Sequence, residues 1–419
     1  MDKFKNLFKS EFARNVLTLM TGTVLAQAIP IAISPILTRI YTPEDFGVLS
    51  LFIAITAITG VIANAKYEQA VVLPEFEKEA ISLLYLGLFI STVVSALLLV
   101  CIFLLEDEIV FALKEEKIRE WLYFIPLSTF LIGLYNMFNY YNIREKKFNN
   151  VSKALVYKSA GLSVSQLGLS FVKQGAFGLI LGQILSFFCG NLVLIKSVKG
   201  KFATNKLDFR GLKSLAIKYK KFPLFSMPSV FLNAVNLNMI NFLITTFYTI
   251  EILGFYSLTQ RIIGIPSRVL GSSFGQVYFQ KATEEYQKTG KTLNTFKKTL
   301  KKLVLIGIPI FTLLFFISEP LFELVFGVEW RVAGYYSKLL TPLAFSRFIS
   351  SALSTTMTIH MKQQLGLFIN ISLITLSIVI FVFSKHMLYD FQQMLIVFSC
   401  SLTLAYLTFI YLYWRVAKS

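Results

Sequence analysis

Apolar residues form long runs along almost the whole chain, and short polar stretches separate them. Runs of about 20 residues are long enough to cross a hydrocarbon core about 30 Å thick as α-helix. The alternation of apolar and polar residues that marks a transmembrane β-barrel does not occur. The pattern therefore predicts an all-α membrane protein with about twelve transmembrane helices. The predicted spans cover residues 16–37, 45–65, 81–105, 121–141, 151–171, 175–197, 224–247, 253–279, 299–318, 334–357, 365–384 and 391–413.

Composition and the spacing of the spans define the domain organisation. Of the 419 residues 55% are hydrophobic, whereas soluble domains contain about 45–50%. The longest connection between spans, residues 198–223, is basic and lies at the midpoint. We therefore expect an N-terminal six-helix lobe over 1–197, a basic cytoplasmic linker over 198–223 and a C-terminal six-helix lobe over 224–419. The first apolar run contains Ala26-Gln27-Ala28, which imitates a signal-peptidase site, but it continues to Leu37 and is expected to stay as an uncleaved helix.

The net charge of +18 is concentrated in a few loops. Residues 196–223 contain nine of the 41 Lys and Arg, and residues 281–302 contain seven. This bias fits the positive-inside rule with both termini in the cytoplasm, and basic loops of this kind contact anionic membrane lipids. We expect a multi-pass membrane protein with no nucleic-acid partner.

A short motif occurs twice at an offset of 207 residues. The segment Tyr41–Leu51 reads YTPEDFGVLSL and the segment Tyr248–Leu258 reads YTIEILGFYSL, with six of eleven positions identical. Each copy lies between the first two spans of its half, where Thr can cap a helix and an acid can meet the positive end of the helix dipole. The alternative is that one type of helical turn arose twice. The pattern favours a duplicated bundle with parallel halves.

Motifs for catalysis and for cofactors are missing or incomplete. The sequence GSSFG at 271–275 matches a hydrolase nucleophile elbow, but it lies within a predicted span, where small residues favour close helix packing. The three cysteines all fall in spans, and no grouping of metal ligands is present. We therefore expect neither an enzyme nor a bound cofactor.

Basic residues within the spans are the strongest functional signal. An Arg or Lys at the centre of a membrane helix costs roughly 2.5–3.5 kcal/mol even on lenient scales. The spans contain Lys158, Arg261, Arg268, Lys338 and Arg347, of which Lys338 lies close enough to an end to snorkel. Two polar stripes at helical spacing contain three of these cations, one formed by Ser257, Arg261, Gly264, Arg268 and Ser272 and the other by Arg347, Ser351, Ser354 and Thr358. Several cations with few acids to neutralise them indicate an anionic substrate.

Other polar residues leave two interpretations open. Asn233 and Asn236 lie in the seventh span, where neutral polar groups either line a cavity or join helices. Lys66 and Glu68 lie near the end of the second span. Glu68 either responds to a coupling cation or, as we favour, pairs with Lys66.

Four segments together resemble the bacterial polysaccharide-export flippases, which share a superfamily with the MATE multidrug exporters. The resemblance covers essentially all twelve spans. In order along the chain the segments are LTRIYTPEDFG, NAKYEQAVVLP, KFPLFSMPSVFLNAVN and GFYSLTQRIIGIPSRVLGSSFGQVYFQKA.

The resemblance implies two six-helix lobes of the MOP-exporter (MATE-like) fold around a cationic cavity, with alternating access. It also implies a substrate, an oligosaccharide linked to undecaprenyl pyrophosphate, and as further partners a polysaccharide polymerase and a chain-length regulator. The alternatives are a cation-coupled small-molecule exporter and a sugar polymerase or ligase. The candidate substrate-binding residues are Arg268, Arg347, Lys158, Arg261, Arg39, Lys66, Asn233 and Asn236.

Overall fold

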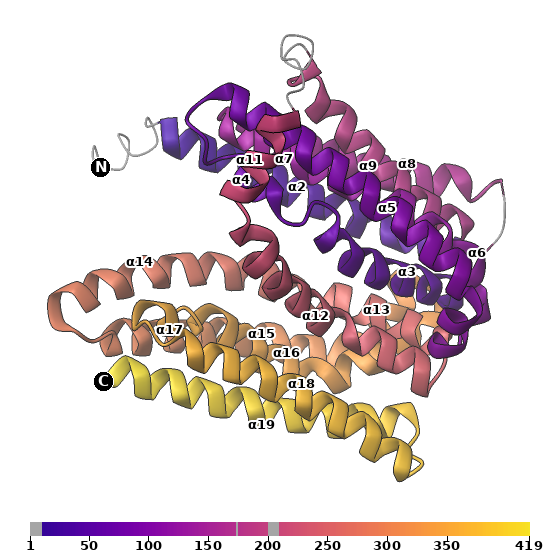
Figure 1. Cartoon of the computed structure of the whole chain (residues 1–419). Coiled ribbons are helices and arrows are strands. Elements are labelled where there is room, and N and C mark those ends of the chain that lie inside the picture. The colour runs from indigo at the N-terminus through magenta and orange to yellow at the C-terminus, as the bar shows by residue number, and fades with distance from the viewer. Residues whose placement is uncertain (1–10, 173–174, 200–208) are drawn as a thin grey trace. The chain divides into compact units, whose positions relative to one another are not determined.

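The chain is described by a computed structural model that covers residues 11–172, 175–199 and 209–419 (Figure 1). Every regular element in these ranges is helical, so the predicted all-α fold is confirmed. Each predicted span corresponds to one helix or to consecutive helical segments. The middle of the predicted linker lies outside the described residues.

Internal contacts divide the chain into two compact units, Met1–Thr246 and Phe247–Ser419. The division falls at the end of the seventh span, so that almost all of this helix is grouped with the first unit. The predicted lobe boundary at the linker stays a prediction. The helical segments of the first unit are α2 (Glu11–Ile40), α3 (Pro43–Ile62), α4 (Tyr67–Ala70), α5 (Glu77–Leu113), η1 (Glu116–Ile118), α6 (Arg119–Leu122), α7 (Phe124–Arg144), α8 (Phe148–Leu169), α9 (Phe177–Ile195), α11 (Phe209–Lys218), η2 (Phe222–Ser226) and α12 (Met227–Phe247), whose last residue belongs to the second unit.

The second unit repeats much of the packing of the first. Its segments are α13 (Ile250–Ile263), η3 (Ser267–Gly271), α14 (Ser272–Thr289), α15 (Leu293–Phe326), η4 (Val328–Trp330), α16 (Arg331–Leu353), α17 (Thr356–Ile359), α18 (Gln363–His386) and α19 (Phe391–Lys418). In the first unit α7 packs against α3, α5 and α9, and α8 packs against α9. In the second unit α16 packs against α13, α15 and α19, and α18 packs against α19. These helices are equivalent in chain order, so the packing supports the predicted duplication.

The two copies of the YT motif adopt the predicted role at helix starts. The hydroxyl of Thr42 accepts a hydrogen bond from the backbone N–H of Asp45 at the start of α3, and the Asp45 carboxylate accepts one in return from the N–H of Thr42. The hydroxyl of Thr249 likewise accepts from the N–H of Ile252 at the start of α13. Both helices carry an acid in the first turn. A side-chain cap of this kind contributes about 0.5–2 kcal/mol.

Hydropathy separates the membrane helices into two groups. Within the described ranges eight helices are long and apolar enough to span a membrane, or nine if the bent pair formed by residues 116–122 and α7 is one span. The remaining predicted spans are α8, the α13–α14 segment and α16, which are helical but more polar or interrupted. These three carry Lys158, Arg261, Arg268, Lys338 and Arg347. The basic residues found within the predicted spans thus lie on the three spans that are more polar or interrupted.

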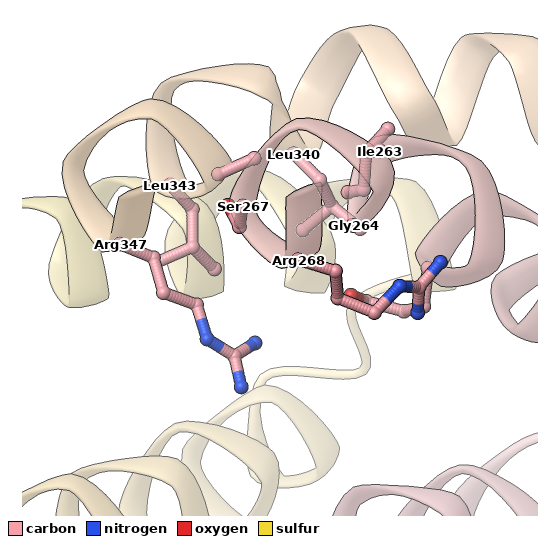
Figure 2. Close-up of a pocket in the computed structure, with 9 residues that line it drawn as sticks. Ile263, Gly264, Ser267, Arg268, Leu340, Leu343 and Arg347 are labelled. Atoms are coloured by element: carbon pink, nitrogen blue, oxygen red, sulfur yellow. The ribbon is translucent and has the colours of Figure 1, made fainter. Parts of the chain in front are cut away.

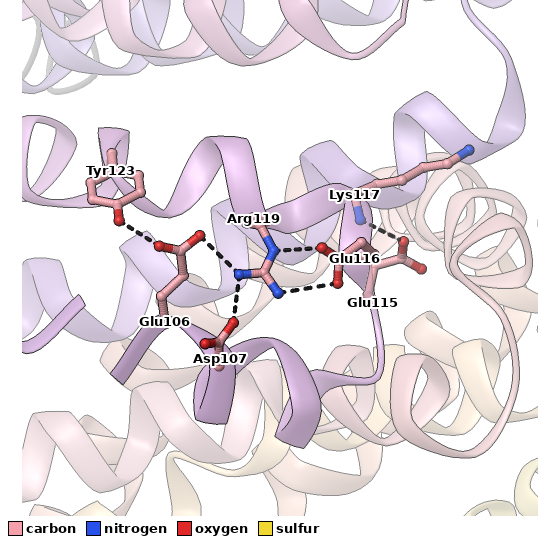
Figure 3. Close-up of polar contacts among 7 residues, drawn as sticks. All are labelled: Glu106, Asp107, Glu115, Glu116, Lys117, Arg119 and Tyr123. Carbon is pink, nitrogen blue, oxygen red and sulfur yellow. Dashed lines mark hydrogen bonds and ion pairs between the residues drawn. The ribbon is translucent and has the colours of Figure 1, made fainter. Parts of the chain in front are cut away.

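The acid-rich loop after α5 connects helices through ionic contacts (Figure 3). The guanidinium of Arg119 contacts Glu106 and Asp107 of α5 together with Glu116, and the hydroxyl of Tyr123 donates to Glu106. Most of these groups are exposed, so each pair contributes little alone, but the contacts join α5 to the start of α7.

Two contacts position the helices of the second unit. Gly334 lets α16 approach α15 closely, because a Cβ at this position would lie 2.7 Å from the carbonyl oxygen of Ser318 and 2.8 Å from the Cα of Glu319. The carboxylate of Glu285 near the end of α14 accepts hydrogen bonds from the backbone N–H groups of Asn294, at 3.0 Å, and Thr295, at 2.7 Å. Glu285 thereby caps the first turn of α15.

Candidate functional site: an arginine pocket in the second unit

The eighth predicted span is interrupted near its middle. Helix α13 ends at Ile263, and the chain resumes as the π-turn η3 and then as α14. Pro266 lies in the break, where its missing N–H and its ring are incompatible with a continuous helix. The predicted span over 253–279 thus consists of consecutive helical segments. By contrast, the helices run through Pro30, Pro35, Pro309 and Pro342.

The break forms one wall of a pocket, and α16 forms the other (Figure 2). The pocket has a volume of about 300 Å³. Its polar lining is Gln260, Ser267, Arg268 and Arg347, and its apolar lining comes from α13 and α16. No carboxylate is among the described residues that line it. The pocket therefore combines two cationic side chains with an apolar lining.

The two arginines reach the pocket from different segments. Arg268 lies on η3, and one of its terminal nitrogens donates to the carbonyl oxygen of Arg261 at 2.6 Å, in the last turn of α13. This bond fixes the guanidinium against the end of the helix. Arg347 extends from α16, and Figure 2 shows its side chain leaving the helix beyond Leu343. Among the described residues Arg347 has no hydrogen bond or ion pair, so its donors remain available.

Arg347 belongs to an exposed stripe on a helix that is otherwise largely buried. Along α16 and its continuation, Arg347, Ser351 and Thr358 are exposed and Ser354 is partly exposed, whereas most of their neighbours on the helix are buried. The predicted spacing of the tenth span thus does place these residues on one face. Gly271, within the motif that imitates a hydrolase elbow, lies against Phe348 and Ser351 of this helix. The interpretation of that motif as close helix packing is confirmed.

Two pocket residues were not singled out from the sequence. Gln260 and Ser267 flank the predicted stripe of Arg261, Gly264 and Arg268. The amide of Gln260 donates to the hydroxyl of Tyr256 at 2.8 Å, which orients its carbonyl oxygen. Gln260 and Ser267 each precede an arginine of the predicted stripe by one residue. The predicted stripe shifted by one residue would therefore have included both of them.

Lys158 lies in a different environment, inside the first unit. Its ammonium lies 3.5 Å from the centre of the Phe187 ring and 5.0 Å from that of Tyr135. Cation–π contacts of a desolvated ammonium contribute about 2 kcal/mol. The rings of α7 and α9 thus give Lys158 a role in packing, and its predicted role as a substrate ligand stays a prediction.

Lys66 and Glu68 form a buried ion pair. Their charged groups are 3.1 Å apart, and the side chains are 11% and 2% exposed. The preferred interpretation, that Glu68 pairs with Lys66, is confirmed. Lys66 and the preceding Ala65 have positive φ values of 64° and 48°, a left-handed conformation that is unfavourable for residues other than glycine. The ion pair thus lies in a strained turn.

The remaining candidates do not line the arginine pocket. Arg39 is exposed in the last turn of α2, Asn233 is exposed on α12 and Asn236 is half-buried there. Arg261 contributes its carbonyl oxygen to Arg268, and its side chain is not part of the pocket lining. Of the eight candidates, the structure brings only Arg268 and Arg347 together in this pocket.

Lys338 proves to be an ion-paired residue. Its ammonium lies 3.1 Å from a carboxylate oxygen of Glu319 on α15. The sequence predicted that Lys338 snorkels toward the membrane surface. The structure adds Glu319 as its ion-pair partner. For metals, the described residues contain no group of three or more His, Cys, Asp or Glu that could hold an ion.

Comparisons with known proteins agree with the fold. The chain is similar to the teichuronic acid biosynthesis protein TuaB of Bacillus subtilis (strain 168), with 21% identity over 247 residues. That match covers 58% of this chain and half the length of TuaB.

Two solved structures show the same fold at 12% identity. The lipid II flippase MurJ in an inward closed conformation gives a TM-score of 0.74, with 96% of this chain and 90% of that chain covered. An inward-facing multidrug resistance MATE family transporter of the MOP superfamily gives 0.70, with 95% and 93% covered. The chain thus has the fold of the MOP exporters.

The profile of one family matches most of the chain. The match covers residues 36–334, which include both YT motifs and the break at Pro266. It also includes α13 and η3 in full and the start of α16, and so contains Arg268, although it ends before Arg347. The chain belongs to the family described as polysaccharide biosynthesis protein.

Proposed function

We propose that the chain is a flippase for an oligosaccharide linked to undecaprenyl pyrophosphate. It would move this lipid from the cytoplasmic to the periplasmic leaflet of the bacterial inner membrane. The observation that carries the proposal is the pocket in which Arg268 and Arg347 meet without a carboxylate in the lining. Membership in a polysaccharide biosynthesis family and the fold shared with a lipid II flippase support it.

The pocket chemistry fits a pyrophosphate with an attached sugar. Guanidinium groups bind phosphate oxygens through two parallel hydrogen bonds, which are stronger than bonds between neutral groups. Arg347 supplies a free guanidinium, and Arg268 is oriented by the carbonyl oxygen of Arg261. Gln260 and Ser267 add neutral polar groups of the kind that bind sugar hydroxyls. The polyprenyl chain would remain in the lipid.

Translocation would follow the alternating access of duplicated transporters, in which one repeat moves against the other. The break at Pro266 and the π-turn η3 place the pocket arginine Arg268 at a point where the regular α-helical geometry changes. Arg39, Lys66, Arg261, Asn233 and Asn236 stay predicted as further headgroup contacts, whereas the cation–π contacts of Lys158 favour a role in packing. A polymerase and a chain-length regulator on the periplasmic side would use the delivered units.

The rival function is export of a small cationic molecule, because the fold is also that of a MATE transporter. A pocket for a cation needs acidic or aromatic groups. The polar lining found here consists of two arginines, a glutamine and a serine. This polarity favours the anionic lipid.

The proposal is tested by deleting the gene and following the lipid-linked oligosaccharide in the membrane. We expect it to accumulate on the cytoplasmic leaflet and surface glycan to disappear, and both changes to be reversed by the wild-type gene. Normal surface glycan together with a new sensitivity to cationic drugs would instead support the exporter.

A further inference from the structure

An apolar groove in the first unit lies apart from the arginine pocket. It has a volume of about 510 Å³, which is within the range of small-molecule sites. Its walls come from α5 and α7 and include Leu88, Phe89 and Leu134. The linker helix α11 closes one end and contributes Lys213, the single charged residue of the lining.

Helix α11 is attached firmly to the first unit, so that the closed end is a defined structure. Leu215 is buried against the core of this unit. The carbonyl oxygen of Ala216 accepts a hydrogen bond from the hydroxyl of Tyr67 at 3.0 Å. The ammonium of Lys218 lies 2.9 Å from a carboxylate oxygen of Glu79 at the start of α5. This ion pair neutralises Glu79.

Lys213 remains as an uncompensated charge beside the groove. Its side chain is exposed, and no hydrogen bond or ion pair joins it to any other described residue. This charge makes the closed end of the groove electropositive, whereas Lys220 and Lys221, which are also exposed, are not part of the groove lining.

The open side of the groove faces the apolar surroundings of a membrane helix. Phe89 is 65% exposed, and further along α5 Leu97 and Phe103 are 58% and 72% exposed. Such a helix surface is solvated by lipid chains in a membrane. Two hydroxyl-bearing residues, Tyr85 and Thr92, are among the groove lining, and the hydroxyl of Thr92 already donates to the carbonyl oxygen of Leu88. The rest of the α5 and α7 lining is apolar and suits a hydrocarbon chain.

We propose that this groove binds an anionic phospholipid of the cytoplasmic leaflet. One acyl chain lies between α5 and α7, and the headgroup phosphate contacts the ammonium of Lys213. The basic linker is predicted to be cytoplasmic, and the inner leaflet attracts basic segments through its negative surface potential. The bound lipid would fasten α11, which belongs to the connection between the two halves, to α5. This inference does not depend on the proposed transport function.

The test is photo-crosslinking of the full chain in nanodiscs of defined lipid. A photoreactive phenylalanine analogue replaces Phe89 in the groove or, as a control, Phe103 outside it. The nanodiscs contain phosphatidylglycerol and phosphatidylcholine in equal amounts, and crosslinked lipid is identified by mass spectrometry. We expect position 89 to capture phosphatidylglycerol with a preference of about fivefold, the factor that a single lysine provides near an anionic surface. Position 103 should show no such preference.

Matched substitutions in the linker complete the test. Lys213→Gln should abolish the preference at position 89, while Lys220→Gln, which removes an exposed linker lysine outside the groove, should leave it unchanged. Leu134→Trp, which fills the groove, should reduce total lipid capture there. Equal capture of both lipids by the wild type, or an unchanged preference in Lys213→Gln, would overturn the proposal. So would displacement of phosphatidylglycerol from position 89 by added undecaprenyl phosphate at trace amounts, because this would assign the groove to the polyprenyl chain.

Discussion

Replacement of Arg347 separates substrate binding from stability more cleanly than any other change in the pocket. Its guanidinium is exposed and has no partner among the described residues. Arg347→Ala should therefore change the free energy of unfolding by no more than about 0.5 kcal/mol. Arg268 is less suitable, because its bond to the carbonyl oxygen of Arg261 is lost as well.

The expected effect on binding follows from the phosphate contact. A hydrogen bond that involves a charged group contributes about 1.5–3 kcal/mol, and 1.4 kcal/mol corresponds to a factor of ten in affinity. Arg347→Ala should weaken binding of a polyprenyl pyrophosphate about 10- to 150-fold. Arg347→Lys should have a smaller effect, since lysine keeps the charge but cannot form two parallel bonds.

The assay is equilibrium binding of a short-chain polyprenyl pyrophosphate to the purified protein in nanodiscs, with thermal unfolding measured in parallel. Arg331→Ala is the matched control. Arg331 lies on the same helix and is 62% exposed, but it pairs with Glu323 and is not part of the pocket lining. An Arg347→Ala protein that binds as tightly as the wild type, or an equal loss in Arg331→Ala, would refute the reasoning.

Three further predictions concern packing and pH. Gly334→Ala should destabilise the protein by about 1–3 kcal/mol, which a lower melting temperature would show. The control Gly168→Ala should be neutral, because no atom lies within 4 Å of its new Cβ. Equal melting temperatures of the two variants would contradict the close packing of α15 and α16. Lys158→Met should preserve both folding and glycan export, because the ammonium lies over aromatic rings; loss of export with normal folding would return Lys158 to the substrate site. Burial raises the pKa of Glu285, but hydrogen bonds from Thr295 and its neighbour outweigh burial and leave this pKa below its usual 4.5. The ionised Glu285 cap therefore stabilises the folded protein above pH about 4.5, and this contribution to the free energy of unfolding is lost as the pH falls through the pKa of Glu285 in the folded state. Glu285→Gln should remove this part of the pH dependence of the free energy of unfolding.

The sequence predicted the membrane helices and the internal repeat well, because both depend on local pattern. Apolar runs identified helices such as α5 and α19, and Thr42 and Thr249 marked the starts of α3 and α13. Hydropathy did not reveal that the span around Pro266 divides into α13, η3 and α14. A proline within an apolar run is compatible with both outcomes, as the continuous helix around Pro342 shows.

The candidate site was predicted in part. Arg268 and Arg347 were identified because a charge at mid-span has few explanations other than function or pairing. Their meeting in one pocket depends on the tertiary packing of η3 against α16. The aromatic neighbours of Lys158 and the Glu319 partner of Lys338 lie on other helices, so sequence spacing along one helix could not reveal them.

The central claim is that Arg268 and Arg347 recognise the pyrophosphate of a lipid that the protein moves between leaflets. The most direct measurement reconstitutes the purified protein in liposomes whose outer leaflet contains the lipid-linked oligosaccharide and follows its loss from the outer surface with a glycosidase. We predict rapid transfer by the wild type and by Arg331→Ala, and only the protein-free rate for the double variant Arg268→Ala/Arg347→Ala. Transfer by the folded double variant at the wild-type rate would contradict the account.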